Sequence, residues 1–337
     1  MRRVRFAPSP TGSLHLGNAL SAAANRAYGD VMLLRIDDTD PERNVPGGEA
    51  AILADLEWLG IRWDDGPFHQ SARAERHVEA WLTAGLPDRF DGIQLMRESG
   101  TPTYQLASVV DDIDFAITHV IRGNDHRPNE AVQRALHAAF GHEPPDYVYH
   151  GLVLGPDGRK LSKREPGATV ASMRAGGVPA EAVRAYLEEL GLPRHDVHYD
   201  PERIRSLSVD AIAALADDEL AARAEIPLAA VPLVRGAHDL HEARQLAESV
   251  LAAPPPAEAT ADERTRLTLT RFAELRGALP ELLGRDEAKA VLRELKAVGG
   301  NLRSLRVALT GSEHGPELWA VLHALPRDEA LRRARLL

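Results

Sequence analysis

Two lysines that lie three positions apart are the residues of this chain best suited to phosphate chemistry. The 337-residue sequence has 40 basic residues, and only four of them are lysines. Lys160 and Lys163 are two of these four, and Ser162 lies between them. A lysine ammonium is a compact charge, whereas an arginine guanidinium is a planar fork. Because a turn segment at 155–158 (GPDG) comes just before, we expect a loop whose ammonium groups stabilise negative charge developing on a polyphosphate.

A second candidate lies near the N-terminus, at His15 and Gly17. These residues begin a predicted helix directly after a predicted strand and a turn at 8–12 (PSPTG). The free N–H groups of a helix N-terminus bind phosphate, and a histidine there can donate a hydrogen bond to a phosphate oxygen in the transition state. A glycine lets a flat base or ribose approach the backbone. The chain has no GxxxxGK[ST] segment, which excludes a P-loop. The two segments therefore predict a phosphate-binding site built from distant parts of the chain.

The pattern of apolar residues predicts the elements that position these segments. Alternating strands and helices in the first half predict an α/β, Rossmann-like, doubly wound parallel sheet, with its ligand at the carboxyl ends of the strands. The predicted strands are 4–7, 31–36, 108–110, 118–121 and 147–154. The predicted helices are 14–28, 49–59, 74–82, 130–140 and 179–190. The remainder, from about residue 200, is predicted to be mostly α-helical.

Composition restricts the class of protein. The hydrophobic fraction of 44% and the charged fraction of 27% are typical of a soluble globular chain. Cysteine is absent, which excludes thiolate metal sites and fits the cytoplasm. We expect no membrane association, because no apolar run approaches the length of a membrane span. The net charge of −10 argues against a uniformly basic surface. A cluster of arginines near the C-terminus is predicted either to form a separate basic surface or to be a solvated helical face: Arg303, Arg306, Arg332, Arg333 and Arg335.

The string from Arg5 to Asn18 and the segment from Lys160 to Arg164 together resemble the two ATP-handling signatures of class I aminoacyl-tRNA synthetases of the glutamyl/glutaminyl subfamily. The resemblance implies His15, Lys160, Ser162 and Lys163 as catalytic residues. It also implies ATP, with Mg²⁺ bound to it. The implied ATP-binding residues are Pro8, Thr11, His15, Gly17, Asn18, Lys160, Leu161, Ser162, Lys163 and Arg164.

Three further segments resemble the amino-acid pocket of the glutamyl enzymes: 35–40 (RIDDTD), 100–112 and 118–126. The implied glutamate-binding residues are Arg5, Ala7, Ser9, Asp37, Tyr104, Ser108 and Arg122. Arg122 is a suitable partner for the γ-carboxylate, since a guanidinium binds a carboxylate through two hydrogen bonds. Two positions depart from the family, which usually has glutamate where Asp37 and Asn124 stand here.

The resemblance also predicts how the chain is divided. We expect a catalytic domain at 1–195, a helical bundle at 196–253, a linker at 254–262 and an anticodon-binding-like helical domain at 263–337, in which Arg303 and Arg306 contact tRNA. The family carries a large acceptor-binding insertion after the segment that ends at Arg73. Here a short connective segment near 74–99 stands in its place. The zinc site that some relatives carry in that insertion cannot form without cysteine.

Three functions remain open from the sequence. The first is a compact, monomeric glutamate–tRNA ligase, which forms glutamyl-adenylate and passes glutamate to the tRNA 3′ end. The second is a glutamate-adenylating paralogue that passes glutamate to another acceptor, such as a modified tRNA base. Residues 45–49 and 104–107 resemble the sequence motifs of such enzymes, the glutamyl-queuosine type. The third is a non-catalytic binding or regulatory protein that has kept the fold. The segment 301–311, which resembles the anticodon region of the ligases, favours the first.

Overall fold

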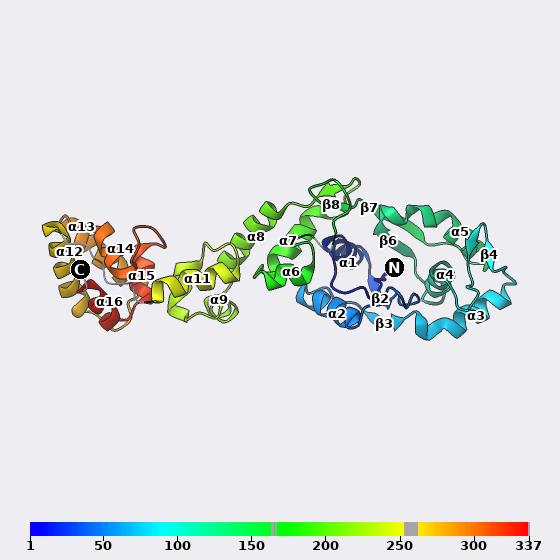
Figure 1. The fold of residues 1–337 in the computed structure, drawn as a ribbon, viewed down its shortest axis with the longest axis horizontal. Coiled ribbons are helices and arrows are strands. Elements are labelled where there is room, and N and C mark those ends of the chain that lie inside the picture. The colour runs from blue at the N-terminus through cyan, green and yellow to red at the C-terminus, as the bar shows by residue number, and fades with distance from the viewer. Residues whose placement is uncertain (163–164, 166, 253–261, 336–337) are drawn as a thin grey trace. The chain divides into compact units, whose positions relative to one another are not determined.

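The computed structural model describes residues 1–162, 165, 167–252 and 262–335. Lys163 and Arg164 of the predicted ATP site lie outside the described residues, as does nearly all of the predicted linker. The chain forms two compact units (Figure 1). Unit 1 comprises 1–176 and 183–204, and unit 2 comprises 177–182 and 205–337.

Unit 1 is built on parallel strands. Strand β2 lies between β1 and β3 and runs parallel to both, and β6 pairs in parallel with β7. Strand β6 lies beside β1, and the N–H of Thr118 donates to the carbonyl oxygen of Arg3 at 2.9 Å. The spatial order is therefore β3-β2-β1-β6-β7, which is the doubly wound arrangement predicted from the sequence. The strands of unit 1 are β1 (Arg3–Phe6), β2 (Val31–Ile36), β3 (Asp65–His69), β4 (Arg89–Phe90), β5 (Ile93–Gln94), β6 (His119–Gly123), β7 (Asp146–His150), β8 (Val153–Leu154) and β9 (Val197–His198).

Helices connect these strands (Figure 1). They are α1 (Leu16–Tyr28), α2 (Gly48–Trp58), α3 (Ala74–Thr83), α4 (Tyr104–Asp114), α5 (Glu130–Ala139), α6 (Val170–Ala175) and α7 (Ala180–Leu190), with 3₁₀ turns η1 (Ser71–Arg73) and η2 (Asn124–Asn129). The strand predicted at 108–110 is wrong, because these residues lie within α4. The apolar residues Leu106, Val109, Val110 and Ile113 recur at helical spacing, and this period outweighs the strand propensity of two adjacent valines.

Strand β3 was absent from the sequence prediction because Gly66 and Pro67 interrupt it. Proline cannot donate a ladder hydrogen bond and is confined to edge strands, which is where β3 lies. Gly66 has φ +100°, and a Cβ atom there would lie 2.3 Å from the carbonyl oxygen of Leu34. Glycine therefore allows β3 to approach β2, whose pairing register shifts between Leu33 and Arg35.

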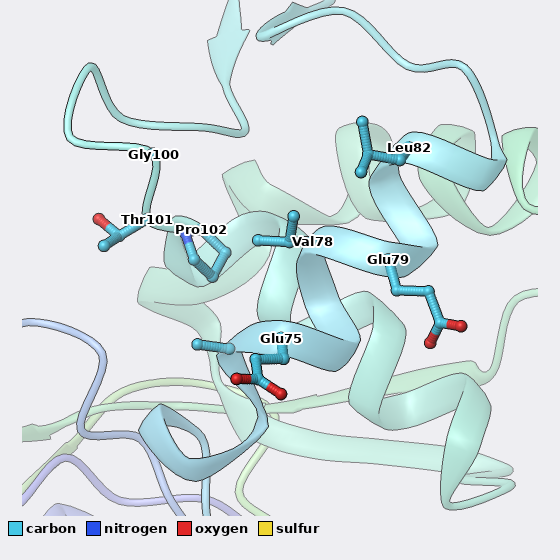
Figure 2. A pocket seen from close by; sticks show the side chains of 8 residues that line it. Glu75, Val78, Glu79, Leu82, Gly100, Thr101 and Pro102 are labelled. Carbon is cyan, nitrogen blue, oxygen red and sulfur yellow. The ribbon is translucent and has the colours of Figure 1, made fainter.

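The connective segment between α3 and α4 contains only the short β4–β5 hairpin and loops. A shallow apolar groove of about 450 Å³ lies on it, between one face of α3 and the loop at 100–102 (Figure 2). Figure 2 shows Val78 and Pro102 facing one another across this hollow, with Glu75 and Glu79 at its rim. None of the residues predicted to handle ATP or glutamate lines the groove.

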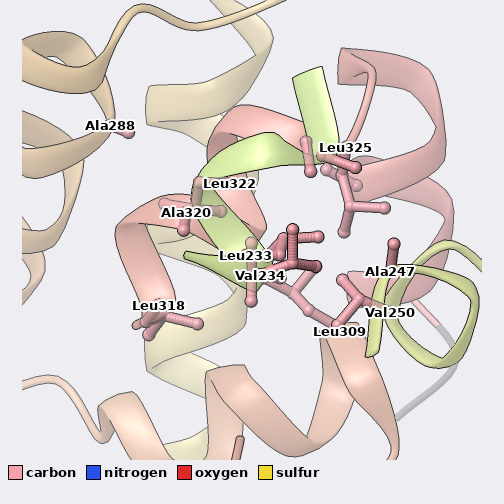
Figure 3. Close-up of a cluster of buried hydrophobic side chains, with 14 of the residues drawn as sticks. Leu233, Val234, Ala247, Val250, Ala288, Leu309, Leu318, Ala320, Leu322 and Leu325 are labelled. Carbon is pink, nitrogen blue, oxygen red and sulfur yellow. The ribbon is translucent and has the colours of Figure 1, made fainter. Parts of the chain in front are cut away.

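Unit 2 is helical. Its helices are α8 (Pro201–Ala214, shared with unit 1), α9 (Asp217–Ala224), η3 (Leu228–Ala230), α10 (Val231–Val234), α11 (Leu240–Leu251), α12 (Glu263–Gly277), α13 (Arg285–Ala297), α14 (Leu302–Thr310), α15 (Leu318–Ala324) and α16 (Arg327–Ala334). Helices before and after 253–261 share one hydrophobic core, in which Leu233 and Val250 pack with Leu309 and Leu322 (Figure 3).

Arg333 joins the same helices. Its guanidinium is fully buried and donates to the carbonyl oxygens of Val250, Leu251 and Leu309, each at 2.7 Å. The predicted exposed basic cluster is therefore wrong for Arg333, which caps the carboxyl ends of α11 and α14. No helix in the described part of the chain is both long and apolar enough to cross a membrane.

Candidate active site

The turn that follows β1 is held from two sides. The carbonyl oxygen of Pro8 accepts the N–H of Asp37, the residue that follows β2. The carbonyl oxygen of Pro10 accepts the N–H of Val45, and a Cβ atom on Gly48 would lie 2.2 Å from the same oxygen. The first residue of α2 must therefore be glycine, since the turn packs directly on the helix N-terminus and leaves no room for a Cβ atom.

His15 is the N-cap residue of α1. Its Nδ1 accepts the N–H of Asn18 at 3.1 Å, so a neutral ring carries its proton on Nε2. A Cβ atom on Gly17 would lie 3.1 Å from the His15 ring, which explains the glycine at that position. The cap fixes the orientation of the imidazole at the positive end of the helix, where phosphate binds best.

The lysine segment begins on the second arm of a tight hairpin. Leu154 pairs with Lys160, and the N–H of buried Leu161 donates to the carbonyl oxygen of Val153 at 2.9 Å. Further along, Thr169 forms a bridge with His15. The segment that carries His15 is therefore bonded through its backbone to residues 168–170, which follow the lysine segment in the chain, although 145 residues separate Lys160 from His15 in the sequence.

Lys160 has a partner that the sequence analysis did not assign. Its Nζ donates to Asp125 Oδ2 at 2.6 Å, and Asp125 lies in the 3₁₀ turn that follows β6. Burial raises the pKa of the Asp125 carboxyl, but the hydrogen bond from Lys160 reverses this and lowers the pKa overall. The pair holds the ammonium near the sheet edge while leaving it half-exposed.

His126 marks the point where several charges converge. Burial lowers its pKa; the adjacent Asp125 opposes this, and the charges of Arg122, Lys160 and Arg5 lower it further. Geometry places the same groups near two neighbouring strand ends. Arg5 and Arg122 lie near the carboxyl ends of β1 and β6, and Lys160 bonds to Asp125 in the turn that follows β6.

A buried network of ion pairs lies beneath this region. Arg35 donates to both carboxylate oxygens of Asp37, at 2.7 and 3.2 Å, and to Asp112 at 3.1 Å. Arg5 donates to the same Asp112 at 3.2 Å. Burial raises the pKa of Asp37 despite the charge of Arg35. Two of the residues predicted to bind glutamate, Arg5 and Asp37, are therefore linked to one another through Arg35 and Asp112.

Asp111, the acid that precedes Asp112 on α4, anchors this helix to its neighbours. Asp111 accepts hydrogen bonds from Arg73, His77 and Gln70, at 2.7, 2.7 and 3.1 Å. Burial raises the pKa of Asp111, but its partners, His77 first, bring the pKa below its usual value. In the sequence, Asp111 and Asp112 belong to the segment 100–112, and neither was assigned a role. Two acids on the apolar face of a helix would have been the signal, but a strand was predicted at 108–110.

Arg122 differs from the other buried arginines. Its Nη2 donates to the Tyr149 hydroxyl at 3.2 Å, and its guanidinium lies 5.1 and 5.5 Å from the ring centres of Tyr147 and Tyr149. Its Nε and Nη1 are buried and have no acceptor among the described residues. The hydroxyl of Ser108, also buried, likewise lacks a partner in the described structure. A desolvated cation with two unsatisfied donors calls for an anion.

The remaining predicted residues lie in the turn after β1, at the start of α4 and just beyond the lysine hairpin. Ala7, Ser9 and Thr11 are half-buried in the turn after β1, and Tyr104 is the first residue of α4. Ser162 follows Leu161 directly after the hairpin. Asn124 donates to Asp196 at 3.2 Å. The described residues contain no cluster of histidine and acidic side chains that could hold a metal ion by itself.

The two arginines predicted to contact tRNA are engaged within unit 2. Arg303 pairs with Glu313, and Arg306 donates to the carbonyl oxygen of Pro316. These bonds connect α14 to the loop that follows it.

Comparison with known proteins agrees with this geometry. The sequence profile described as "tRNA synthetases class I (E and Q), catalytic domain" matches residues 1–82 and 86–209, more than half of the chain. Glutamate–tRNA ligase 1 of Rubrobacter xylanophilus is 34% identical, and the alignment covers 98% of this chain and 96% of that protein. The chain belongs to the glutamate–tRNA ligase family of class I aminoacyl-tRNA synthetases.

Solved structures show the same fold. The glutamate tRNA ligase of Elizabethkingia meningosepticum superimposes with a TM-score of 0.78 at 22% identity and covers 99% of this chain. That of Elizabethkingia anophelis gives a TM-score of 0.77 at 21% identity. Both structures are covered almost completely, at 98% and 99% of their lengths.

This family member is compact. The alignment with the Rubrobacter ligase runs over 418 positions, whereas this chain has 337 residues, so many positions have no residue here. The profile match is interrupted at 83–85, where α3 ends. This is the connective segment, where the sequence analysis expected most of the acceptor-binding insertion to be missing.

Proposed function

We propose that this chain activates glutamate with ATP and transfers it to the 3′ end of tRNA. The observation that carries the choice of amino acid is Arg122, a buried guanidinium with two unsatisfied donors beside the ion pairs of Arg5 and Asp37. Glutamate has one ammonium and two carboxylates, so one carboxylate remains for Arg122 when the other reacts. Family membership supports this substrate.

In the first step an oxygen of the glutamate α-carboxylate attacks the α-phosphorus of ATP, and the bond to the β-phosphate oxygen breaks. Pyrophosphate leaves, and glutamyl-adenylate remains. His15 donates from Nε2 to the phosphate oxygens as their charge grows, and Lys160 with Lys163 neutralises the leaving pyrophosphate. Asp37 accepts the substrate ammonium while Arg35 holds its carboxylate in place. Mg²⁺ bound to ATP would add positive charge at the same phosphates.

In the second step a hydroxyl of the terminal ribose of tRNA attacks the carbonyl carbon of the adenylate, and AMP leaves with its electron pair. The similarity to ligases over their whole length favours this acceptor. A second acceptor, a modified tRNA base, is favoured by one observation, which is the shortness of the segment around 83–85.

ATP–pyrophosphate exchange with glutamate, glutamine and aspartate, with and without total tRNA, tests the proposal. We expect exchange with glutamate but not with glutamine or aspartate, and we expect this exchange to require tRNA. Glutamate should also be found attached to the 3′ end of the tRNA. Exchange without tRNA and without 3′-acylated product would support the second acceptor. No exchange with any of the three amino acids would overturn the enzyme assignment.

A further inference from the structure

The other two lysines of the chain lie on one helix of unit 2, where they form part of a basic stripe. Along α13 the cations are Arg285, Lys289, Arg293 and Lys296. At about 100° per residue these four positions fall within about 80° of one another, over about three helical turns. The buried residues Ala288, Val291 and Leu295 attach the neighbouring sector of the helix to the core. The stripe therefore has a fixed direction relative to unit 2.

The stripe is unusual because its charges are not paired. Within the described part of unit 2, neither a salt bridge nor a hydrogen bond engages any of its four side chains, and Arg205 and Arg335 are the only other cations of which this is true. Elsewhere in the unit, exposed arginines pair with acids, as Arg244 does with Glu225 and Glu248. The acids of α13 itself lie outside the basic sector, and Asp286 is the nearest to it.

Trp319 of α15 orders one end of the stripe. Its ring centre lies 4.8 Å from the guanidinium of Arg285 and 5.4 Å from the ammonium of Lys289. The indole packs against the core, so it is a rigid platform for these two charges. Holding long side chains in place reduces the conformational entropy that they lose on binding a ligand.

We propose that α13, with Trp319, binds the phosphate backbone of tRNA. A linear row of unpaired cations fits a linear row of phosphates, and its contact is electrostatic rather than base-specific. The chain carries a net charge of −10, so most of its surface repels RNA and a local basic face determines where RNA can approach. The inference rests on the proposed function for the choice of RNA. It moves the expected contact from Arg303 and Arg306, which are bonded internally, to a different helix.

The test compares two full-length variants with the same loss of charge. In the stripe variant, Arg285, Lys289, Arg293 and Lys296 are each changed to Gln. The matched control replaces four arginines that already have acidic partners, and these changes are Arg223→Gln, Arg244→Gln, Arg271→Gln and Arg327→Gln. Binding of unfractionated tRNA is measured between about 50 and 200 mM salt, where counterion release dominates the affinity.

We expect the stripe variant to bind tRNA at least about tenfold more weakly at low salt. The slope of log affinity against log salt concentration should fall by the amount that corresponds to roughly three phosphate contacts. The control should change either value by no more than about twofold. Equal losses in both variants would overturn the proposal, because net charge rather than the stripe would then be responsible. A stripe variant with unchanged affinity for tRNA would also overturn it. The same holds if the stripe variant loses binding to phosphatidylserine vesicles while its tRNA binding is unaltered.

Two further measurements keep the result independent of folding and of catalysis. Circular dichroism and the melting temperature show whether each variant is folded. ATP–pyrophosphate exchange with saturating tRNA should be the same in both variants. If the wild-type protein fails to exchange but the stripe still determines tRNA affinity, the proposed function is wrong and the RNA surface stands.

Discussion

At the scale of single residues, the surroundings of a side chain decide its role. Arg35, Arg333 and Arg122 are all buried arginines. The first two have their donors directed at carboxylates or carbonyl oxygens, so they stabilise the fold. Arg122 alone of these three retains two buried nitrogens without acceptors in the described structure. A buried donor costs free energy unless it is bonded, so this residue indicates a ligand.

Arg122→Ala should raise the KM for glutamate by roughly 30- to 150-fold, which corresponds to about 2–3 kcal/mol for a lost charged hydrogen bond. The KM for ATP should change little. Arg127→Ala is a matched control, since Arg127 is exposed and lies 4.4 Å from the same Tyr149 ring. Pyrophosphate exchange at varied glutamate measures both. A normal glutamate KM in Arg122→Ala would remove this residue from the pocket.

Glu329 makes part of the stability depend on pH. Hydrogen bonds from Arg332, and then from Arg333, lower its pKa to about 2. Its contribution is therefore fully present above about pH 4.5 and is lost as the pH falls toward 2. The shift corresponds to at most about 3 kcal/mol, and partial exposure reduces this to about 1–2 kcal/mol. Urea unfolding of the wild type and Glu329→Gln should differ by that amount at pH 6 and converge below about pH 2. A constant difference would contradict the assignment.

At the scale of elements, short polar contacts connect parts of the site that the sequence keeps apart. Ser13, in the turn before α1, donates to Asp55 of α2 at 2.6 Å and accepts the N–H of Ala171 in α6 at 3.1 Å. Asp55 is fully buried and also accepts the N–H of Leu14 at 2.8 Å. One hydroxyl thus positions the segment carrying His15 relative to α2 and α6.

Ser13→Ala should lower the free energy of unfolding by about 1–2 kcal/mol, because one oxygen of buried Asp55 and the N–H of Ala171 lose a partner. The maximal rate of pyrophosphate exchange should fall more than glutamate affinity does, since the turn positions ATP-binding groups. Ser249→Ala, which removes an exposed hydroxyl in unit 2, should change neither value. A fall in stability with unchanged exchange would show that the contact supports only the fold.

At the scale of the whole molecule, the predicted ATP and glutamate site and the largest helical core belong to different units. The predicted ATP and glutamate residues all belong to unit 1, whereas unit 2 has its own continuous core. That core includes helices on both sides of 253–261, so the two C-terminal regions expected from the sequence share one set of buried side chains. Ligands of the active site should therefore stabilise one unit selectively.

Saturating ATP and glutamate, at about 100 times their Kd, should stabilise unit 1 by about 2.7 kcal/mol for each ligand that binds independently. Scanning calorimetry should show two transitions, of which only one rises by roughly 5–10 °C per ligand. Arg333→Ala should lower the other transition, because it leaves three carbonyl oxygens unpaired in unit 2. A single transition that moves as a whole under both changes would contradict this independence.

The sequence by itself determined the class of fold and the positions of its motifs. Strand β2 lies at the predicted residues, and α1, α2, α5 and α7 begin within two residues of prediction, because their hydrophobic periods are long and clear. The helix at 104–114 and the strand at 65–69 were missed, since a valine pair and a Gly-Pro pair obscured the local pattern. Local propensity is weak and is overridden by burial.

Only the tertiary structure decided which of the predicted residues have partners. Lys160 pairs with Asp125, and Arg5 and Asp37 are linked through Asp112 and Arg35. Arg122 keeps two donors without an acceptor among the described residues. In unit 2 it paired Arg303 with Glu313 and buried Arg333, while the cations of α13 have no acidic partner among the described residues. The physical reason is that a charged residue type limits only the bonds a side chain can make. Which bonds form depends on groups that folding brings from distant positions, and no local pattern records their distance.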